Sequence, residues 1–381
     1  MLEVLTAGAA HDDDLAMILR ADARHIPLRD GCVQTVVTSP PYWGLRDYGT
    51  ARWEGGDADC DHLEPPRGGR DPITAAKQLT SAGTLTYQFA NECRKCGSRW
   101  RDAQIGLEPT PEAYVATMVS VFREVRRVLR DDGTVWLNLG DSYAGSGRGP
   151  SGNFQPDASC LDNRIPVPGL KPKDLCGIPW RVAFALQADG WYLRSDIIWA
   201  KPNPMPESVT DRPTRSHEYI FLLSKSERYF YDQDAIREPN LESSIQRMMK
   251  PWNGETVRGH PSGRAQMISG GRAGGNAPMA NVDPNGRNKR SVWTVNSEPT
   301  PEAHFATFPQ KLIEPCILAG SRTGDLVLDP FIGSGTVGKV AERFGRRWVG
   351  LELSENYIGI AKNRTAQRGM QFGTTPTLGT K

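Results

Sequence analysis

The chain has 381 residues, of which 46 are lysine or arginine and 44 are aspartate or glutamate, so its formal net charge is only +2. This length suits one large α/β domain with insertions or two ordinary domains, and the charge balance excludes a protein that holds a polyanion through net charge alone. Seven cysteines, an odd number, do not fit a secreted disulfide framework, and no apolar run approaches the roughly 20 residues that span a bilayer, so we expect a cytoplasmic protein without a membrane partner.

The first predicted strand covers residues 31–38 (GCVQTVVT) and runs directly into a proline corner, Ser39-Pro40-Pro41-Tyr42-Trp43. The two prolines end any ladder, so the chain must turn here. Open α/β sheets bind their ligands at such turns, at the carboxyl ends of strands. Two prolines alone indicate only a sharp exposed turn, so a functional interpretation of the corner depends on a second motif. We assign residues 1–50 to the catalytic part of an α/β core.

Residues 51–104 are predicted to be an insertion, because turn residues and charges replace any regular period. The segment contains two close pairs of metal-ligand residues, Cys60-x-His62 and Cys93-x-x-Cys96. Thiolate and imidazole ligands in such pairs are typical of small zinc sites, and four protein ligands would close the coordination sphere of a structural ion. A dithiol redox pair and unrelated surface residues are the alternatives.

The segment 105–237 returns to alternating helices and strands, which predicts a mostly parallel sheet with helices on its faces. The expected elements are a helix at 111–129, ended by Asp132-Gly133, a strand at 134–139, a glycine- and proline-rich loop at 140–173, a helix at 179–188 and strands at 192–200 and 217–223.

Residues 238–290 are polar and rich in glycine, asparagine and arginine, so they cannot bury much apolar surface by themselves. The α/β character resumes in residues 291–370, and a flexible tail is expected at 371–381. The elements expected in this last part of the core are helices at 309–319, 336–344 and 355–368 and strands at 326–328 and 347–351.

A glycine-rich loop, Asp329-Pro330-Phe331-Ile332-Gly333-Ser334-Gly335-Thr336, joins a strand to a helix. Glycines in this context let the backbone approach a nucleotide-like ligand, and Glu352 follows the next strand, where doubly wound folds grip a ribose diol. A purely structural turn is the plain alternative. Gly333 to Lys339 also spells most of a phosphate-binding loop, but Val340 replaces the magnesium ligand, so a P-loop NTPase is the weaker alternative.

The proline corner and the glycine loop resemble the catalytic and cofactor motifs of DNA amino-methyltransferases, and their order resembles the group called beta. Other matching segments are Trp199-x-Lys201-Pro202-Asn203-Pro204-Met205-Pro206, His217-Glu218-Tyr219-Ile220-Phe221, His304-Phe305-Ala306-Thr307-Phe308-Pro309 and Val349-Gly350-Leu351-Glu352. The resemblance implies a Rossmann-like α/β core with a mostly parallel sheet, which uses S-adenosylmethionine. The zinc-ribbon-like insertion and the target-recognition segment lie outside the resemblance and are expected to be inserted into this core.

The resemblance assigns the target base to Ser39, Pro40, Pro41 and Tyr42. The exocyclic amine of cytosine or adenine delocalises its lone pair into the ring, so acceptors such as Ser39 Oγ and the Pro40 carbonyl are needed to hold it in a more nucleophilic geometry. Pro41 keeps the corner rigid, and Tyr42 can stack on a base flipped out of the duplex. Serine in the first position is more often seen in cytosine-N4 enzymes and aspartate in adenine-N6 enzymes. We therefore favour cytosine N4, with adenine N6 as the alternative.

The resemblance assigns the cofactor to the glycine loop, the acid beyond it and three flanking positions. Asp22 resembles a family position near the adenine, although Ala21 stands where glycine is common. Aromatic rings beside the methionine end attract a sulfonium cation, with core packing as the alternative. The expected cofactor residues are Asp22, Phe305, Phe308, Asp329, Pro330, Phe331, Gly333, Ser334, Gly335, Thr336 and Glu352.

The expected partner is double-stranded DNA, bound by a monomer or homodimer. Residues 238–290 are either a disordered linker or, as we favour, a target-recognition region whose basic side chains bind phosphates and read base edges. A catalytically silent zinc-containing DNA-binding module is the non-enzymatic alternative. We exclude attack on cytosine carbon 5, because Cys316 lies within an apolar helix. The candidate DNA contacts are Arg258, Arg264, Arg272, Arg287, Lys289 and Arg290.

Overall fold

The structure is a computed structural model that describes residues 16–44, 50, 52–57, 59–62, 76–79, 85–88, 92–93, 95–144, 169–242, 283, 285–298 and 308–366. The chain divides into two compact units, one formed by residues 1–231 and 291–381 and the other by residues 232–290. The predicted recognition region at 238–290 lies within the second unit.

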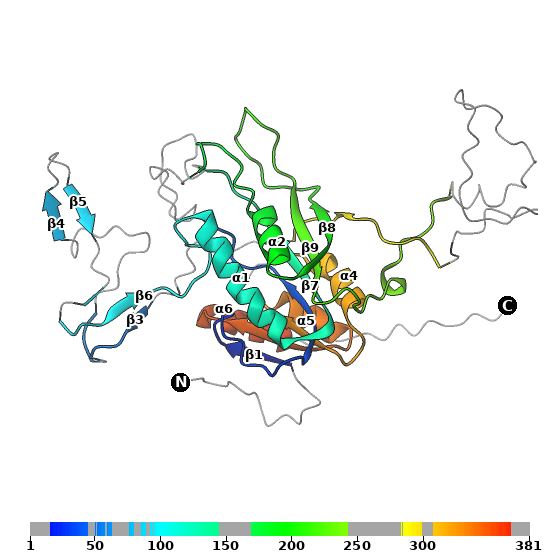
Figure 1. Cartoon of the computed structure of the whole chain (residues 1–381), viewed down its shortest axis with the longest axis horizontal. Helices are drawn as coiled ribbons and strands as arrows, with labels where there is room; N and C mark the ends of the chain where they lie inside the picture. The colour runs from blue at the N-terminus through cyan, green and yellow to red at the C-terminus, as the bar shows by residue number, and fades with distance from the viewer. Residues whose placement is uncertain are drawn as a thin grey trace, which may run out of the picture. The chain divides into compact units, whose positions relative to one another are not determined.

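The first unit carries all the strands and helices described, apart from one short 3-10 helix, η1 (Asp234–Ile236), in the second (Figure 1). Its strands are β1 (Ala16–Arg20), β2 (Val33–Thr38), β3 (Arg52–Glu54), β4 (Ala76–Leu79), β5 (Leu85–Gln88), β6 (Arg99–Arg101), β7 (Leu129–Leu139), β8 (Tyr192–Ala200), β9 (His217–Ser224), β10 (Val292–Thr294), β11 (Leu326–Asp329) and β12 (Arg347–Glu352). Its helices are α1 (Pro111–Val128), α2 (Ile178–Ala188), α4 (Gln310–Gly320), α5 (Thr336–Arg343) and α6 (Glu355–Ala366).

Eight of these strands form one sheet in the order β1-β12-β11-β2-β7-β9-β8-β10. The pairings are parallel except for those of β9, which runs antiparallel to both β7 and β8. This confirms the expected Rossmann-like core with a mostly parallel sheet. Strands β2 and β11 are neighbours although they are far apart in the sequence, since Val327 pairs with Thr35 and Leu328 with Val36. The carboxyl ends of these two strands therefore lie side by side.

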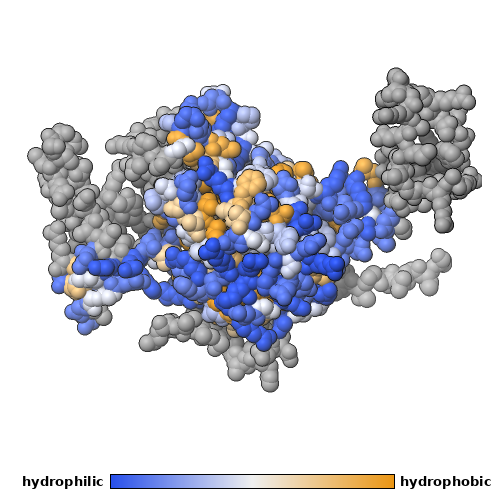
Figure 2. All heavy atoms as spheres, viewed as in Figure 1, coloured by the Kyte–Doolittle hydropathy of each residue, from blue (hydrophilic) through white to orange (hydrophobic). Residues whose placement is uncertain are grey.

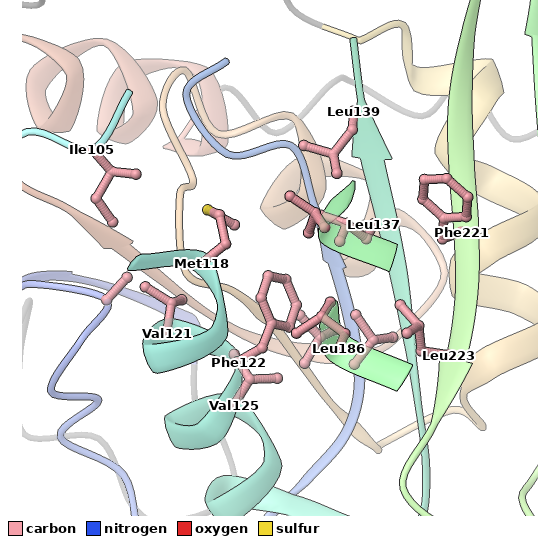
Figure 3. Close-up of a cluster of buried hydrophobic side chains, with 14 of the residues drawn as sticks. Ile105, Met118, Val121, Phe122, Val125, Leu137, Leu139, Leu186, Phe221 and Leu223 are labelled. Carbon is pink, nitrogen blue, oxygen red and sulfur yellow. The ribbon is translucent and has the colours of Figure 1, made fainter. Parts of the chain in front are cut away.

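Helices cover both faces of the sheet. On one face the apolar side of α1, which includes Met118 and Phe122, packs with Leu186 of α2 against Leu137 of β7 and Phe221 of β9 (Figure 3). On the other face α4 and α5 pack against β2, β7 and β12. Because both faces are buried, β2 is buried along its whole length, as parallel central strands usually are.

Strands β3, β4, β5 and β6 of the insertion were not expected, and within the eight-stranded sheet the structure differs from the sequence-based expectation at three strands. Strands β1 and β10 were not expected, because runs of five and three residues give too little periodicity to distinguish a strand from a loop. Strand β7 begins at Leu129, whereas Asp132-Gly133 was expected to separate the helix from a strand at 134–139. The pairing with β2 shifts register between Val33 and Thr35, so this pair of turn-forming residues lies in an irregularity of the strand.

The visible face of the described residues is mostly hydrophilic, with an apolar area over α2 (Figure 2). Helix α2 carries Phe184, which is 55% exposed. Among the described residues, no helix is both long enough and apolar enough to cross a membrane.

Two helical glycines provide a matched test of this packing. A Cβ on Gly338 of α5 would lie 2.8 Å from the buried Trp348 ring, whereas one on Gly359 of α6 would meet nothing within 4 Å. We expect Gly338→Ala to destabilise the protein by roughly 1 to 3 kcal/mol through overpacking. Gly359→Ala should leave stability unchanged or raise it by up to about 1 kcal/mol, because alanine favours the helix. Urea unfolding of both variants measures this, and equal effects would contradict the packing described.

Candidate active site

The proline corner and the glycine loop meet at the carboxyl ends of β2 and β11. The side chains of Thr38 and Asp329, the last residues of these strands, are both buried, and Thr38 Oγ1 donates a hydrogen bond of 2.6 Å to Asp329 Oδ1. Phe331 N donates to the same oxygen at 3.0 Å. The two motifs that the sequence singled out are therefore joined by a direct side-chain contact.

Burial of the Asp329 side chain disfavours its ionised form. It raises the pKa of this carboxyl from 3.8 to about 7, despite the two hydrogen bonds that stabilise the charge. The carboxyl group at the junction of the two loops therefore changes protonation near neutral pH.

Ser39 and Tyr42 belong to a polar network at the corner. Tyr42 donates its hydroxyl proton to Glu218 Oε2 at 2.7 Å, and Ser39 Oγ lies 3.2 Å from Asn138 Oδ1. Asn138 Nδ2 donates to Glu218 Oε2 at 3.2 Å and to the Tyr219 carbonyl at 3.1 Å. These two bonds turn the oxygen of the Asn138 amide toward Ser39. Burial and the negative charge of Glu218 together hold the pKa of Tyr42 well above its usual value, so Tyr42 is a neutral donor.

Lys201 completes this network. Its ammonium forms a partly buried ion pair with Glu218 Oε1 and lies 4.1 Å from the centre of the Trp199 ring. The pairing of β8 with β9 places Trp199 opposite Glu218, so the strand register brings Lys201 and Glu218 together. Glu218 Oε1 thus pairs with the Lys201 ammonium, while Oε2 accepts hydrogen bonds from Tyr42 and Asn138.

The backbone of the corner is held from two further elements. The Tyr114 hydroxyl of α1 donates to the Pro41 carbonyl at 2.9 Å. Gly140, just beyond β7, allows the Tyr42 ring to lie against the backbone, since a Cβ there would be 2.4 Å from ring atom Cε2. Pro40 is buried, whereas Ser39 and Tyr42 are partly accessible. The corner is a rigid platform with two partly open side chains.

The glycine loop curves around the carboxylate of Glu352 at the end of β12. Gly333 and Gly335 have φ angles of +48° and +84°, which favour glycine. Gly333 N donates to Glu352 Oε2 at 3.1 Å, and Leu353 N and Ser354 N each donate to Oε1 at 2.9 Å. A carboxylate offers about four acceptor positions, so one stays open for a ligand hydroxyl. Burial raises the pKa of Glu352.

Other predicted cofactor residues occupy different positions around this loop. Ser334 and Thr336 are buried. Arg364 of α6 donates to the Ser334 carbonyl at 2.9 Å and to the hydroxyls of Ser334 and Thr336, so these two residues stabilise the loop through α6. Pro330 is buried and Phe331 is partly exposed. Phe308 is partly exposed just before α4, whereas Phe305 lies outside the described residues.

Asp22 follows β1 at the same edge of the sheet. Arg20, at the end of β1, pairs in the parallel register with Glu352. The Asp22 carboxylate accepts hydrogen bonds from the Arg24 backbone and guanidinium, at 2.9 Å for Arg24 N. The hydrogen bonds and charge of Arg24 lower the pKa of Asp22 although burial opposes this, so Asp22 is ionised at neutral pH.

The four predicted metal ligands come together in the insertion. One ligand atom from each of Cys60, His62, Cys93 and Cys96 lies within 4.8 Å of all the others. The two pairs are separated by a long stretch of sequence, so the clustering reflects the local fold of the insertion.

Comparison with known proteins decides the family. Residues 33–363 match the family described as DNA methylase, which comprises N6 and N4 methyltransferases. This chain belongs to the DNA methylase family. It is 42% identical over 362 residues to the type II methyltransferase M.Cfr9I of Citrobacter freundii, which covers 94% of this chain and 88% of that protein. It is also 42% identical over 335 residues to M.SmaI of Serratia marcescens, covering 87% and 84% of the two chains.

The solved structure of the PvuII cytosine-N4-specific DNA methyltransferase covers 93% of this chain and 89% of its own, with a TM-score of 0.50 and 16% identity. This likeness supports the fold. Membership in the DNA methylase family confirms that the protein is a DNA methyltransferase with S-adenosylmethionine as its cofactor. The P-loop NTPase and the silent DNA-binding module are excluded.

The predicted DNA contacts of the methylase fall into two groups. Arg258, Arg264 and Arg272 lie outside the described residues. In the second unit Arg287, Lys289 and Arg290 gather around Glu238, with their nearest nitrogens 3.2, 3.8 and 3.5 Å from its carboxylate. Three basic side chains therefore contact one carboxylate in this unit.

Sequence analysis assigned no role to Asn138, Glu218 or Lys201. Lys201 and Glu218 lie within segments that resemble the family, and Asn138 is a polar residue in the otherwise apolar run Trp136-Leu137-Asn138-Leu139. Those signals mark the residues as unusual. Their convergence on Ser39 depends on the pairing of β7, β9 and β8, which no local pattern specifies.

The methylase should lose stability as pH rises because of Asp329. The pKa of Asp329 is about 7 in the folded protein and 3.8 in its ordinary state, so the folded state holds this proton more tightly. This contribution to the free energy of unfolding is fully present below about pH 4 and is lost as pH rises to about 7. Asp329→Asn, whose amide oxygen can still accept from Thr38, should remove this dependence. Without cofactor, we expect wild-type stability relative to the variant to fall by roughly 2 to 3 kcal/mol between about pH 5 and pH 8. Denaturant melts at both pH values test this, and parallel changes in the two proteins would contradict it.

Proposed function

We propose that this methylase transfers a methyl group from S-adenosylmethionine to the N4 amine of a cytosine flipped out of double-stranded DNA. The observation that carries the proposal is the orientation of Ser39 at the end of β2, where Asn138 Oδ1 lies 3.2 Å from its hydroxyl. Its curated relatives are named type II methyltransferases, so we further propose that it modifies one specific site as part of a restriction-modification system in the bacterial cytoplasm.

The proton inventory of the network supports an acceptor role for Ser39. The single hydroxyl proton of Tyr42 is directed to the charged Glu218, the stronger acceptor, at 2.7 Å. Tyr42 Oη also lies 3.0 Å from Asn138 Oδ1, but because its one proton goes to Glu218, Asn138 Oδ1 can accept the proton of Ser39. With its proton directed inward, Ser39 Oγ presents lone pairs to the target amine, and the Pro40 carbonyl provides the second acceptor. Two acceptors that hold both N–H bonds draw the amine toward a tetrahedral geometry and expose its lone pair.

Bond formation then requires no enzyme nucleophile. Bound S-adenosylmethionine would supply the methyl group: the amine nitrogen would form the N–C bond as the sulfonium C–S bond breaks to leave a neutral thioether, and the excess proton on nitrogen would pass to solvent water. Asn138 is neutral and cannot accept that proton, so Ser39 serves as an acceptor of a hydrogen bond and not as a base. The rigid proline corner keeps the reacting atoms in position, where an error of about an ångström can reduce the rate by roughly a hundredfold.

We assign the cofactor to the loop around Glu352. Gly333 and Gly335 permit close backbone approach, and Glu352 retains acceptor capacity for a ribose hydroxyl. Asp329 and Phe331 flank the junction with the proline corner, and Asp22 lies at the end of the adjacent strand β1. Ser334 and Thr336 support the loop through Arg364. Pro330, Phe305 and Phe308 complete the assignment at the methionine end.

DNA binding is assigned to the second unit and the rest of the 238–290 region. Arg287, Lys289 and Arg290 gather around Glu238, and we propose that these basic side chains contact DNA phosphates. Arg258, Arg264 and Arg272 are proposed as further contacts, with the protein acting as a monomer or homodimer. Adenine N6 is the second candidate target, because its amine makes the same demands on Ser39 and Pro40.

The identity of the methylated base tests this proposal. The purified methylase is incubated with unmethylated DNA of varied sequence and S-adenosylmethionine, and the digested nucleosides are analysed by mass spectrometry. We expect N4-methylcytosine, with the rate reduced by about a hundredfold or more in Ser39→Ala. N6-methyladenine would retain the mechanism and overturn the choice of base. Full activity in Ser39→Ala would overturn the mechanism.

A second prediction concerns Glu218. Glu218→Gln leaves a single amide oxygen, which cannot face Lys201 and also accept hydrogen bonds from Tyr42 and Asn138. If the oxygen faces Lys201, Tyr42 loses its acceptor and competes with Ser39 to donate to Asn138 Oδ1. We expect slower single-turnover methyl transfer, by roughly tenfold to a hundredfold, with unchanged affinity for S-adenosylmethionine. Glu124→Gln is the matched control, because Glu124 of α1 is also a partly buried carboxylate in an ion pair, here with Arg127, but lies near the amino end of β7. An equal effect in both variants would indicate general destabilisation.

A further inference from the structure

The insertion brings four metal-ligand side chains together, with their ligand atoms within 4.8 Å of one another. Cys60 Sγ and Cys93 Sγ are 3.9 Å apart, and His62 Nε2 and Cys96 Sγ are 3.0 Å apart. Two thiolates on one zinc ion, with Zn–S bonds of about 2.3 Å, lie roughly 3.8 Å from each other. A disulfide would need about 2.05 Å, and Cys60, Cys93 and Cys96 are all free. The separation of Cys60 from Cys93 therefore matches two ligands that share an ion, and His62 and Cys96 lie close enough to complete the set.

The backbone around Cys96 has the form of a metal-binding knuckle. Cys93 N donates to the Ser98 carbonyl at 2.6 Å, and Gly97 N donates to the Cys93 carbonyl at 2.8 Å with a φ of +74° at Gly97. The backbone amides of Asp57 and Ser98 donate to Cys96 Sγ. Two segments of the insertion thus supply hydrogen bonds to one sulfur and fix its position.

The other half of the cluster is oriented by an aromatic contact. The Trp53 ring of β3 stacks on the His62 imidazole with centroids 5.0 Å apart and an interplanar angle of 21°. This contact helps to keep Nε2 directed toward Cys96. Gly56 permits the close approach of the loop, since a Cβ there would lie 2.7 Å from Cys96 Sγ.

The described part of the insertion offers almost no hydrophobic core to hold this arrangement. Of its residues whose exposure the structure describes between positions 50 and 104, only Ser98 is buried. Strands β3 and β6 form only a two-stranded pair, which is marginal in water without further support. An additional link between residues 60–62 and 93–96 is therefore needed.

We propose that Cys60, His62, Cys93 and Cys96 bind one structural zinc ion that holds this ribbon together. Three thiolates and a neutral imidazole fill all four tetrahedral positions, so the ion has no open site for substrate. Binding releases the thiol protons and links metal affinity to folding of the insertion. This role is independent of the choice between cytosine and adenine.

The test begins with metal analysis of the full-length methylase purified without added metal. We expect about one zinc per chain in the wild type, with loss in Cys93→Ser and Cys96→Ser. Cys32→Ser is the matched control, because Cys32 is a partly buried free cysteine outside the insertion, and it should retain the zinc. Replacement by Co²⁺ should give the visible absorption of a tetrahedral thiolate site, which the cluster variants lack.

Two further readouts separate this proposal from the proposed function. Chelation should make residues 51–104 sensitive to protease, while S-adenosylmethionine binding by the core persists. A wild-type protein without zinc, or with zinc retained in Cys93→Ser and Cys96→Ser, would overturn the proposal. A Cys60–Cys93 disulfide in the isolated protein, seen by mass spectrometry, would also overturn it in favour of a redox pair.

Discussion

The hydrogen bond between Thr38 and Asp329 is the contact on which the active site depends. It joins the last residues of two adjacent parallel strands, and each strand opens directly into one functional loop. Because both side chains are buried, the contact exists only if β2 and β11 pair in this register. The sheet therefore sets the distance between the proline corner, which we propose binds the target base, and the glycine loop, which we propose binds the cofactor. Burial of the Asp329 carboxyl at this junction costs free energy when the group is ionised, and its raised pKa reflects that cost.

A second constraint determines what Ser39 does with its hydroxyl. Lys201 and Glu218 form an ion pair on the antiparallel strand pair β8 and β9, and Glu218 directs Tyr42 and Asn138. The network ends on a neutral amide beside Ser39, so it orients a proton without accepting one. Such an arrangement fits an amine that attacks directly on a methyl group. The charges that polarise the network stay one side chain away from Ser39.

Much of the fold and the site could be predicted from local patterns. Strand 192–200 and the helix at 179–188 were placed to within a residue, because apolar periodicity and flanking turns mark them clearly. The proline corner, the glycine loop and the two ligand pairs are likewise local motifs. The polar network was missed because Asn138, Glu218 and Lys201 meet only through strand pairing. The short edge strands β1 and β10 gave no periodic signal, so Asp22 was placed before the first strand although it follows one.

A crystal structure of the methylase with a duplex that contains its modified site, and with S-adenosylhomocysteine in place of the methyl donor, tests the central claim most directly. The account predicts a cytosine outside the duplex, with N4 about 3 Å from both Ser39 Oγ and the Pro40 carbonyl oxygen. It also predicts the Ser39 hydroxyl still bonded to Asn138. A target amine held by other groups, or a base that stays stacked in the duplex, would contradict the assignment of this corner as the site of methyl transfer.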